Sequence, residues 1–167
     1  MKLSHLSHTL IGSEIVKLGG DIRERIRQGE TIFNFTVGDF DPSIFPIPKE
    51  LETAIIEAYQ QHFTNYPLGE GNLDLRQAIA AFVQTFQGLQ YGLDEILVAS
   101  GGRPLIYALY RAICDKGDKV IYAVPSWNNN HYTHFVEGTH VLIQAKAENK
   151  FMPTAEDIRP YVAGATL

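Results

Sequence analysis

The feature that most constrains the fold of this chain is the stretch of residues 96–107, which reads ILVASGGRPLIY. It begins as a short apolar run that ends at two glycines, and a run of this kind indicates a buried strand over residues 96–100. Leu105, Leu109 and Ile113 then repeat at helical spacing, which predicts a helix. The chain must therefore pass from a strand to a helix through a turn that contains both glycines.

The turn at residues 100–103 has the composition of an anion site. Gly101 and Gly102 allow the backbone to approach a ligand closely, and the N–H groups and positive dipole at a helix start favour a negative charge. Arg103 adds a cation, and Pro104 fits the first helical turn because its missing N–H has no intrahelical partner there. The turn predicts a phosphate or carboxylate site, although two glycines at this place are also typical of a plain tight turn. It matches neither a P-loop nor the dinucleotide fingerprint.

The length and charge of the chain bound its class. Its 167 residues can bury the core of one domain, or of one domain with an arm. The formal net charge of −5 argues against nucleic acid and against an anionic membrane surface as partners. No apolar run reaches membrane-spanning length and the first residues have no signal-peptide core, so we expect a cytoplasmic protein. The single cysteine, Cys114, excludes an internal disulfide and is expected to be buried.

The N-terminal half predicts helices separated by turn-rich loops. Residues 4–12 have little pattern and are expected to form a flexible arm. Residues 31–37 are rich in β-branched and aromatic side chains and predict a short strand. The expected helices cover residues 13–28, residues 48–59 and residues 75–86, with glycines at 29 and 88 as stop signals.

Beyond residue 96, strands and helices are expected to alternate. The expected elements are strands at 96–100, 119–124 and 140–144, helices at 104–114 and about 128–136, and a short helix at 155–161 opened by a capping box. Such alternation predicts parallel strands with crossover helices, and ligands that gather at the carboxyl ends of the strands. The loop at Ser100 and the loop at Trp127 are therefore expected to face one site. The last four residues read as the approach to another strand.

Four motifs follow one another along the chain. The first is Val37-Gly38-Asp39-Phe40-Asp41-Pro42, and the second is Asn65-Tyr66-Pro67 together with Gly71 and Leu75-Arg76. The third is Ser100-Gly101-Gly102-Arg103 together with Asp115-Lys116-Gly117-Asp118, and the fourth is Pro125-Ser126-Trp127. Together they resemble the class I/II aminotransferases, which are fold-type I pyridoxal-phosphate-dependent enzymes, and most closely the aspartate-aminotransferase-like branch. The resemblance covers essentially the whole chain. It implies a partial α/β fold: residues 1–48 would form an N-terminal helical arm and small-domain segment, and residues 49–167 the first βαβαβ units of the large, mostly parallel sheet domain.

The resemblance also implies a site for pyridoxal 5'-phosphate. The backbone N–H groups of Gly102 and Arg103, in a turn shaped by Gly101, would hold the cofactor phosphate. Trp127 would stack on the pyridine ring and supply a flat apolar wall. Arg103 stands where many relatives carry lysine, and the two cations are not equivalent neighbours for a phosphate.

Two further residues acquire roles from the same resemblance. Tyr66 would reach the cofactor phosphate of a neighbouring subunit, which implies a homodimer with shared active sites. Gly38 would place its backbone against the substrate carboxylate. The substrates would be an amino acid and a 2-oxo acid, between which the enzyme moves an amino group.

The Schiff-base lysine of the family has no counterpart here. Such a lysine needs desolvation or a neighbouring cation to be a nucleophile at neutral pH, and none of the seven lysines has a sequence setting of that kind. The family's Ser/Asn-Pro-x-Gly loop, its pyridine-binding aspartate and its carboxylate-binding arginine would also lie beyond residue 167. We therefore expect a truncated aminotransferase chain that carries no catalytic residue and is inactive alone.

Two other interpretations stay open: a non-catalytic dimerisation or binding fragment, and another phosphate-binding α/β domain. A metal site at His131, His134 and His140 is conceivable, but histidines on a surface helix are the simpler interpretation, and we expect no metal. Asp39 and Asp41 could be paired carboxylates, but beside a proline they are typical of turn-forming side chains.

Overall fold

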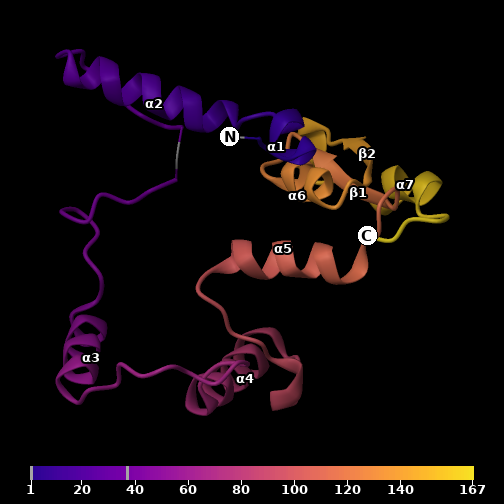
Figure 1. The fold of residues 1–167 in the computed structure, drawn as a ribbon. Helices are drawn as coiled ribbons and strands as arrows, with labels where there is room; N and C mark the ends of the chain where they lie inside the picture. The colour runs from indigo at the N-terminus through magenta and orange to yellow at the C-terminus, as the bar shows by residue number, and fades with distance from the viewer. Residues whose placement is uncertain (1, 37) are drawn as a thin grey trace. The chain divides into compact units, whose positions relative to one another are not determined.

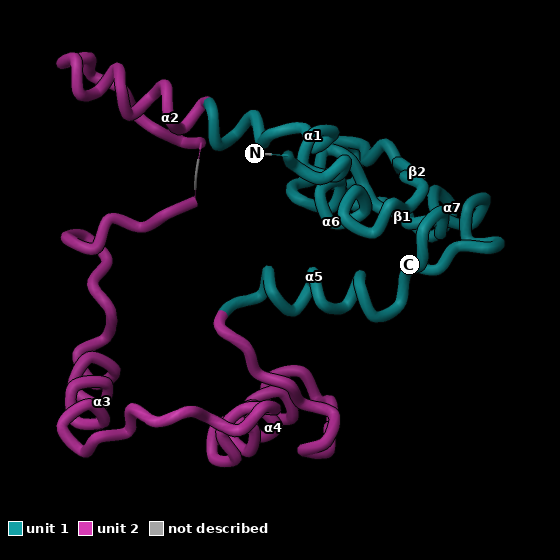
Figure 2. Tube along the Cα trace, viewed as in Figure 1, with its two compact units in different colours: residues 1–17, 101–167 teal, residues 18–100 magenta. Residues whose placement is uncertain are grey.

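The computed structural model describes residues 2–36 and 38–167, and the chain divides into two compact units (Figures 1 and 2). Unit 1 comprises residues 1–17 and 101–167, and unit 2 comprises residues 18–100. Each unit is held together by its own contacts. The domain boundary predicted after residue 48 is a different division and stays a prediction.

Unit 1 is built on a short parallel sheet. β1 (Lys119–Val124) pairs in parallel with β2 (Thr139–Gln144) along its whole length. On the other side of β1, Lys119 forms a parallel bridge with Ala165. The structure thus confirms two of the predicted strands, their parallel arrangement and the approach of the last residues to the sheet.

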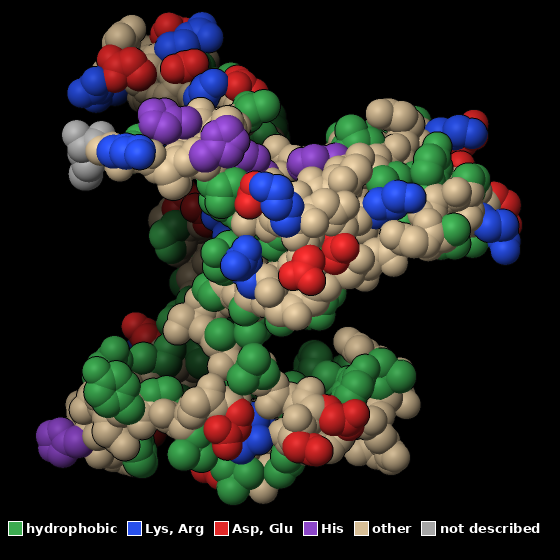
Figure 3. Space-filling model, turned by 45° about the vertical axis from the view of Figure 1, so that its right-hand side comes forward, with side chains coloured by type: hydrophobic (Ala, Val, Ile, Leu, Met, Phe, Trp, Pro, Cys, Tyr) green, Lys and Arg blue, Asp and Glu red, His purple; other side chains and the backbone are tan. Residues whose placement is uncertain are grey.

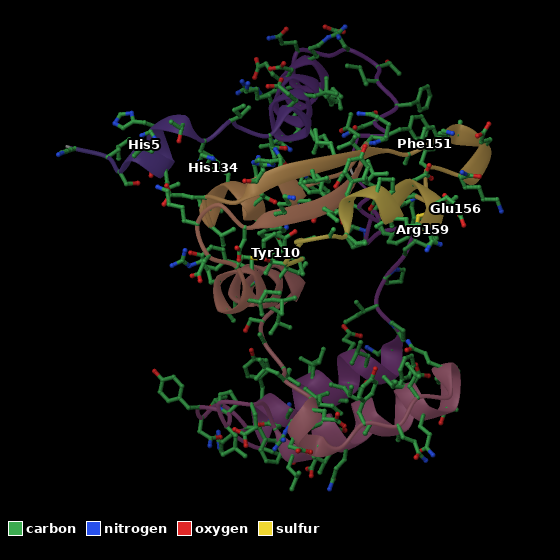
Figure 4. The ribbon with its side chains drawn as sticks, turned by 90° about the vertical axis from the view of Figure 1, so that its right-hand side faces the viewer. His5, Tyr110, His134, Phe151, Glu156 and Arg159 are labelled. Carbon is green, nitrogen blue, oxygen red and sulfur yellow. The ribbon has the colours of Figure 1, made fainter. Side chains whose placement is uncertain are left out.

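Two helices cover one face of this sheet and close the core of unit 1. They are α5 (Gly102–Ile113) and α6 (Asn129–Phe135), and both were predicted. Tyr110 lies between α5 and the strands in Figure 4, with its ring centroid 5.5 Å from that of Tyr132. The buried cluster consists of Tyr110, Cys114, Val120, Tyr132 and Val136. Burial raises the pKa of the Cys114 thiol, which is the buried packing residue that was expected.

The N-terminal arm differs from the expectation of a flexible, unpatterned segment. It contains the short helix α1 (His5–Thr9). The side-chain oxygen of Ser4 accepts a hydrogen bond from the N–H of Ser7 at 3.2 Å and caps this helix. A helix of one turn shows too little periodicity to be detected in sequence, and the serine cap was its only signal.

Unit 2 carries the three predicted amphipathic helices. α2 (Glu14–Arg27) begins in unit 1 and continues into unit 2, and α3 (Lys49–Gln60) and α4 (Leu73–Gln87) follow. Gly88 ends α4 in the left-handed conformation, as the stop signal predicted. Many large apolar side chains of α3 and α4 are exposed, and hydrophobic side chains are conspicuous in the lower part of Figure 3.

Two of the predicted strands are wrong over the residues that the structure describes. Residues 31–36 and residues 96–100 form no strand, and Val37 lies outside the described residues. A strand needs a neighbouring strand for its backbone groups, and an apolar or β-branched composition does not supply one. Phe33 and Phe35 are instead exposed, and the side-chain oxygen of Asn34 accepts from the N–H of Thr36 at 3.0 Å in a local turn.

Short elements complete the chain. They are the 3₁₀ turns η1 (Leu93–Glu95), η2 (Ala147–Asn149) and η3 (Arg159–Tyr161), and the helix α7 (Ala155–Ile158). The capping box predicted for α7 is present, because Thr154 and Asp157 bond to each other's backbone N–H groups. In the part of the chain that the structure describes, no helix is both long and apolar enough to cross a membrane.

Candidate functional site

The start of α5 is open toward a ligand. Gly101 precedes the helix with φ 102° and ψ 161°, a conformation that favours glycine. The N–H groups in the first turn of a helix have no intrahelical partner. Among the described residues no side chain caps this helix, so these N–H groups have no side-chain partner either. A Cβ added at Gly101 or Gly102 would meet nothing within 4 Å. The turn therefore exposes donors and a positive dipole end without steric cover.

Arg103 and Trp127 meet beside this helix start. The guanidinium carbon of Arg103 lies 5.1 Å from the centroid of the Trp127 ring, which is within the range of a cation–π contact. Trp127 is 46% exposed, so its ring also offers surface to a further planar group. The loop after β1 and the turn before α5 thus come together in unit 1, as the sequence predicted for the two loops.

An open hollow of about 380 Å³ lies beside Arg103. Its walls come from α5 and α6, including Arg103, Tyr107, Asn128 and Tyr132. The loop that leads into α6 is fixed locally, because the Asn129 side chain donates to the hydroxyl of Ser126 at 2.7 Å. Ser126 is thereby engaged in the structure of the loop that carries Trp127.

Tyr66 and Gly38, the other two predicted site residues, lie in unit 2. The Tyr66 side chain is 98% exposed. A Cβ added at Gly38 would meet nothing within 4 Å. Nothing in the described residues explains either residue by internal packing, and their roles at a cofactor or substrate stay predictions.

Gly71 and Arg76 form a packed joint whose role sequence reasoning missed. Gly71 has φ 103°, and an added Cβ would lie 2.6 Å from the Cβ of Val98. Arg76 is only 8% exposed, and it donates hydrogen bonds to the carbonyls of Gly71, which precedes α4 in the chain, and Leu93, which follows it. Both residues belong to one of the motifs that carry the family resemblance, but the sequence analysis assigned them no role.

All seven lysines are exposed, and all lie within the described residues. Four of them pair with glutamates at the surface: Lys17 with Glu14, Lys49 with Glu52, Lys116 with Glu137, and Lys146 with Glu148. A Schiff-base lysine is activated by desolvation or by a neighbouring cation, and an exposed amine beside a carboxylate has neither. None of these lysines therefore has the desolvated setting of a Schiff-base residue.

The helix histidines contact the N-terminal arm. The Nε2 atom of His131 lies 3.0 Å from the carbonyl oxygen of Ile11, and that of His134 lies 2.9 Å from the carbonyl oxygen of Leu6. Figure 4 shows His134 on the side of unit 1 that faces the arm. Within residues 2–36 and 38–167, no group of three or more His, Cys, Asp or Glu side chains is arranged to hold a metal ion.

The acidic loop before α3 is a turn, as the sequence favoured. The Asp41 carboxylate accepts from the N–H and the hydroxyl of Ser43, at 2.8 and 2.6 Å. The hydrogen bond from the Ser43 hydroxyl, followed by that from the Ser43 N–H, lowers the pKa of Asp41. Asp41 is therefore engaged in the conformation of its own loop.

Comparison with known proteins places these features in a family. Residues 30–163 match the model for aminotransferase class I and II. Aspartate aminotransferase of Rhizobium meliloti (strain 1021) is 32% identical over 155 residues, which are 92% of this chain and 37% of the relative. A probable aspartate/prephenate aminotransferase of Rickettsia felis is 37% identical over 125 residues, which are 73% of this chain and 30% of the relative.

Solved structures agree. The crystal structure of the Rhizobium meliloti aspartate aminotransferase matches with a TM-score of 0.84 at 31% identity, over 96% of this chain and 40% of the other. The Thermus thermophilus aspartate aminotransferase with maleate matches with a TM-score of 0.87 at 29% identity, over 97% and 42%. The chain thus spans about two fifths of the length of these structures and has a partial fold-type I α/β fold. It belongs to the class I and II aminotransferases, a family of pyridoxal-phosphate-dependent enzymes.

Proposed function

We propose that this chain forms the phosphate-binding part of the active site of an aminotransferase, an enzyme that moves an amino group between an amino acid and a 2-oxo acid. The observation that carries the proposal is the contact of Arg103 with the exposed Trp127 ring beside the uncapped start of α5. A guanidinium and free N–H groups suit the anionic phosphate of pyridoxal 5'-phosphate, and a flat aromatic ring suits its planar pyridine ring.

The residues present fit this cofactor on physical grounds. The first-turn N–H groups of α5 and the Arg103 guanidinium are donors that favour a phosphate. The Trp127 ring is rigid and half exposed, so it orients a flat ring at low entropic cost. When bound, the cofactor supplies an electron sink for bond cleavage at the amino-bearing carbon.

The proposal assigns the other groups of the reaction to polypeptide outside these 167 residues. All seven lysines are exposed, so the Schiff-base amine must come from elsewhere, and we expect this chain alone to bind the cofactor without turnover. Tyr66, almost fully exposed, is available to a second copy of the chain. A homodimer that shares its active sites, in a cytoplasmic enzyme, is part of the proposal.

A fluorescence titration tests the proposal directly, because Trp127 is the only tryptophan. Pyridoxal 5'-phosphate should quench its emission saturably, and inorganic phosphate should compete. Replacement of Arg103 by Ala should weaken binding about tenfold, the scale of one charge-assisted hydrogen bond, and Arg103→Lys should weaken it less. Arg111→Ala removes an arginine near the other end of α5 and should leave the affinity unchanged. Equal losses in both alanine variants would mean that only net charge matters, and would contradict the proposal.

Three measurements separate the remaining interpretations. After incubation with the cofactor and borohydride, mass spectrometry should show no stoichiometric lysine adduct; such an adduct would place a Schiff-base lysine in this chain. Light scattering with cofactor absorbance would reveal a non-catalytic binding fragment, which associates without any cofactor spectrum. Thermal stabilisation by nucleotides in place of pyridoxal 5'-phosphate would point to a different phosphate-binding activity.

A further inference from the structure

Arg76 is a charged side chain in the interior of unit 2. It lies in the first turns of α4, and its residue is 8% exposed. Burying a guanidinium is costly unless its N–H groups find acceptors. Here Nη1 donates to the carbonyl of Leu93 at 2.8 Å, Nε donates to the carbonyl of Gly71 at 3.3 Å, and Nη2 lies 3.4 Å from a carboxylate oxygen of Glu70.

The two carbonyls belong to two different segments of the chain. Gly71 ends the loop that carries Tyr66, and Leu93 opens the 3₁₀ turn η1 that precedes residues 96–100. The planar guanidinium of Arg76 therefore holds both segments against the start of α4.

A second contact joins the same two segments directly. The N–H of Val98 donates to the carbonyl of Glu70 at 3.0 Å. The missing side chain of Gly71 lets the Val98 side chain approach, since an added Cβ would be 2.6 Å away. The loop before α4 and the segment that runs toward Ser100 are thus fixed at two points, by Arg76 and by Val98.

We propose that Arg76 is a positioning residue for the cofactor-binding turn. Within unit 2 it holds residues 93–98, the segment that leads into the turn at residues 100–103, against the base of the loop that presents Tyr66. The link to the cofactor rests on the proposed function; the clamp itself does not. Lysine keeps the charge but lacks the planar fork, so it cannot reach both carbonyls with the same geometry.

Hydrogen exchange tests the clamp without any ligand. Arg76→Lys should raise the exchange rate about tenfold in peptides covering residues 65–72 and 93–100, as expected for the loss of one hydrogen bond from a charged group, while β1 and β2 keep their rates. Ile79→Ala is the control, because it weakens α4 packing without touching the two carbonyls. Unchanged rates in both peptides, or a uniform rise over the unit like that of the control, would overturn the clamp.

Two safeguards keep the outcome decisive. If Arg76→Lys does not fold, Glu70→Gln removes the charge from the longest of the three contacts, and it should raise the same two rates by a smaller factor. Circular dichroism and the thermal midpoint establish that each variant is folded before exchange is measured. A folded Glu70→Gln with unaltered rates would count against the clamp.

The cofactor step is tested by comparing pyridoxal 5'-phosphate with pyridoxal, which lacks the phosphate. The wild-type chain should bind the phosphorylated form more tightly, and Arg76→Lys should reduce that preference severalfold while leaving pyridoxal affinity unchanged. A purely structural role would weaken both ligands equally and overturn this step. If the wild-type chain itself shows no preference, the proposed function fails, and the exchange rates still decide whether the clamp exists.

Discussion

Two glycine turns in this chain have nearly the same φ angle but different surroundings. Gly71 and Gly101 both precede a helix, α4 and α5, and their φ angles are 103° and 102°. The space beside Gly71 is filled by Val98, whereas nothing lies within 4 Å of the place a Cβ would take at Gly101. The carbonyls of Glu70 and Gly71 also accept hydrogen bonds from Val98 and Arg76. Among the described residues neither helix has a side-chain cap, so the turn at Gly101 differs by its open space and by the neighbouring Arg103.

The difference shows that glycine serves two separate needs. At Gly71 it permits one segment to pack against another, so the turn is complete within the chain. At Gly101 it permits a turn that leaves donors exposed, and this is where the proposed function places the cofactor phosphate. A dipole end without internal partners, next to a cation, is the mark of a ligand site, and an identical φ angle alone is not.

Replacing Gly71 by Ala should produce the largest effect. The positive φ costs about 1–2 kcal/mol, and the clash with Val98 adds about 1–3 kcal/mol of overpacking, so unfolding by urea should show unit 2 destabilised by about 2–5 kcal/mol. Gly88→Ala is the matched control, because it has φ 70° and open space around it. If both variants lose equal stability, the packed and open environments do not differ as described.

Shortening Val98 sharpens the same test. Val98→Ala should cost little by itself, since only two methyl groups leave a site near the surface of unit 2. In the double variant with Gly71→Ala it should recover only the part of the steric loss that comes from the Val98 Cγ2 methyl at 3.0 Å, because alanine keeps the Cβ atom, and it should leave the φ strain. A double-mutant cycle in denaturant measures this coupling, and additive losses would show that the Cγ2 methyl of Val98 is not part of the cause.

Replacing Gly101 by Ala should cost only the conformational strain, about 1–2 kcal/mol, but should weaken binding of pyridoxal 5'-phosphate. The reason is that the alanine distorts the turn that aims the N–H groups. Gly117→Ala is the control in the same unit, with φ 90° and open space, and it should lose similar stability without any loss of affinity. Trp127 fluorescence and thermal unfolding give both quantities. An affinity loss shared by the control would remove the distinction between the two turns.

Mild acid should have the smallest effect and should act on the unit that carries Gly101. Desolvation, followed by repulsion from His134, lowers the pKa of His140. The unfolded chain therefore takes up this proton first, and stability contributed by neutral His140 is present above about pH 6.5 and is lost as the pH falls through the lowered pKa. His140→Asn, which can keep a bond to Tyr122, should flatten the fall in thermal midpoint between pH 7 and 5. A profile identical to that of the wild type would exclude His140 as the cause.

Elements with local signals could be predicted from sequence. The apolar spacing in α2, α4 and α5, and the glycines after α2 and α4, act within a few residues of the chain, and the observed ends lie within one or two residues of the expected ones. The two strands β1 and β2 were found because each is bounded by turn signals and joined by a helix.

Features that depend on distant partners could not be predicted. Residues 31–36 and 96–100 have strand-like composition, but a strand forms only where another strand presents its backbone groups. The acceptors of Arg76 lie five and seventeen residues away, and no spacing rule connects them. The contact of Arg103 with Trp127 joins residues far apart in sequence, and only the expectation that both loops gather at one edge of the sheet brought them together beforehand.

The pairing of β1 has a consequence for association between chains. β1 is flanked by β2 on one side and, through the bond from the N–H of Ile121 to the carbonyl of Leu167 at 2.8 Å, by residues 165–167 on the other. Its backbone is therefore unavailable to an intruding peptide over that length. Within the described residues β2 pairs only with β1, so the unpaired backbone groups on its other edge are where a foreign strand would add. If the protein aggregates, the first change to make is the substitution of a β2 residue by lysine or proline, which would hinder pairing at that edge.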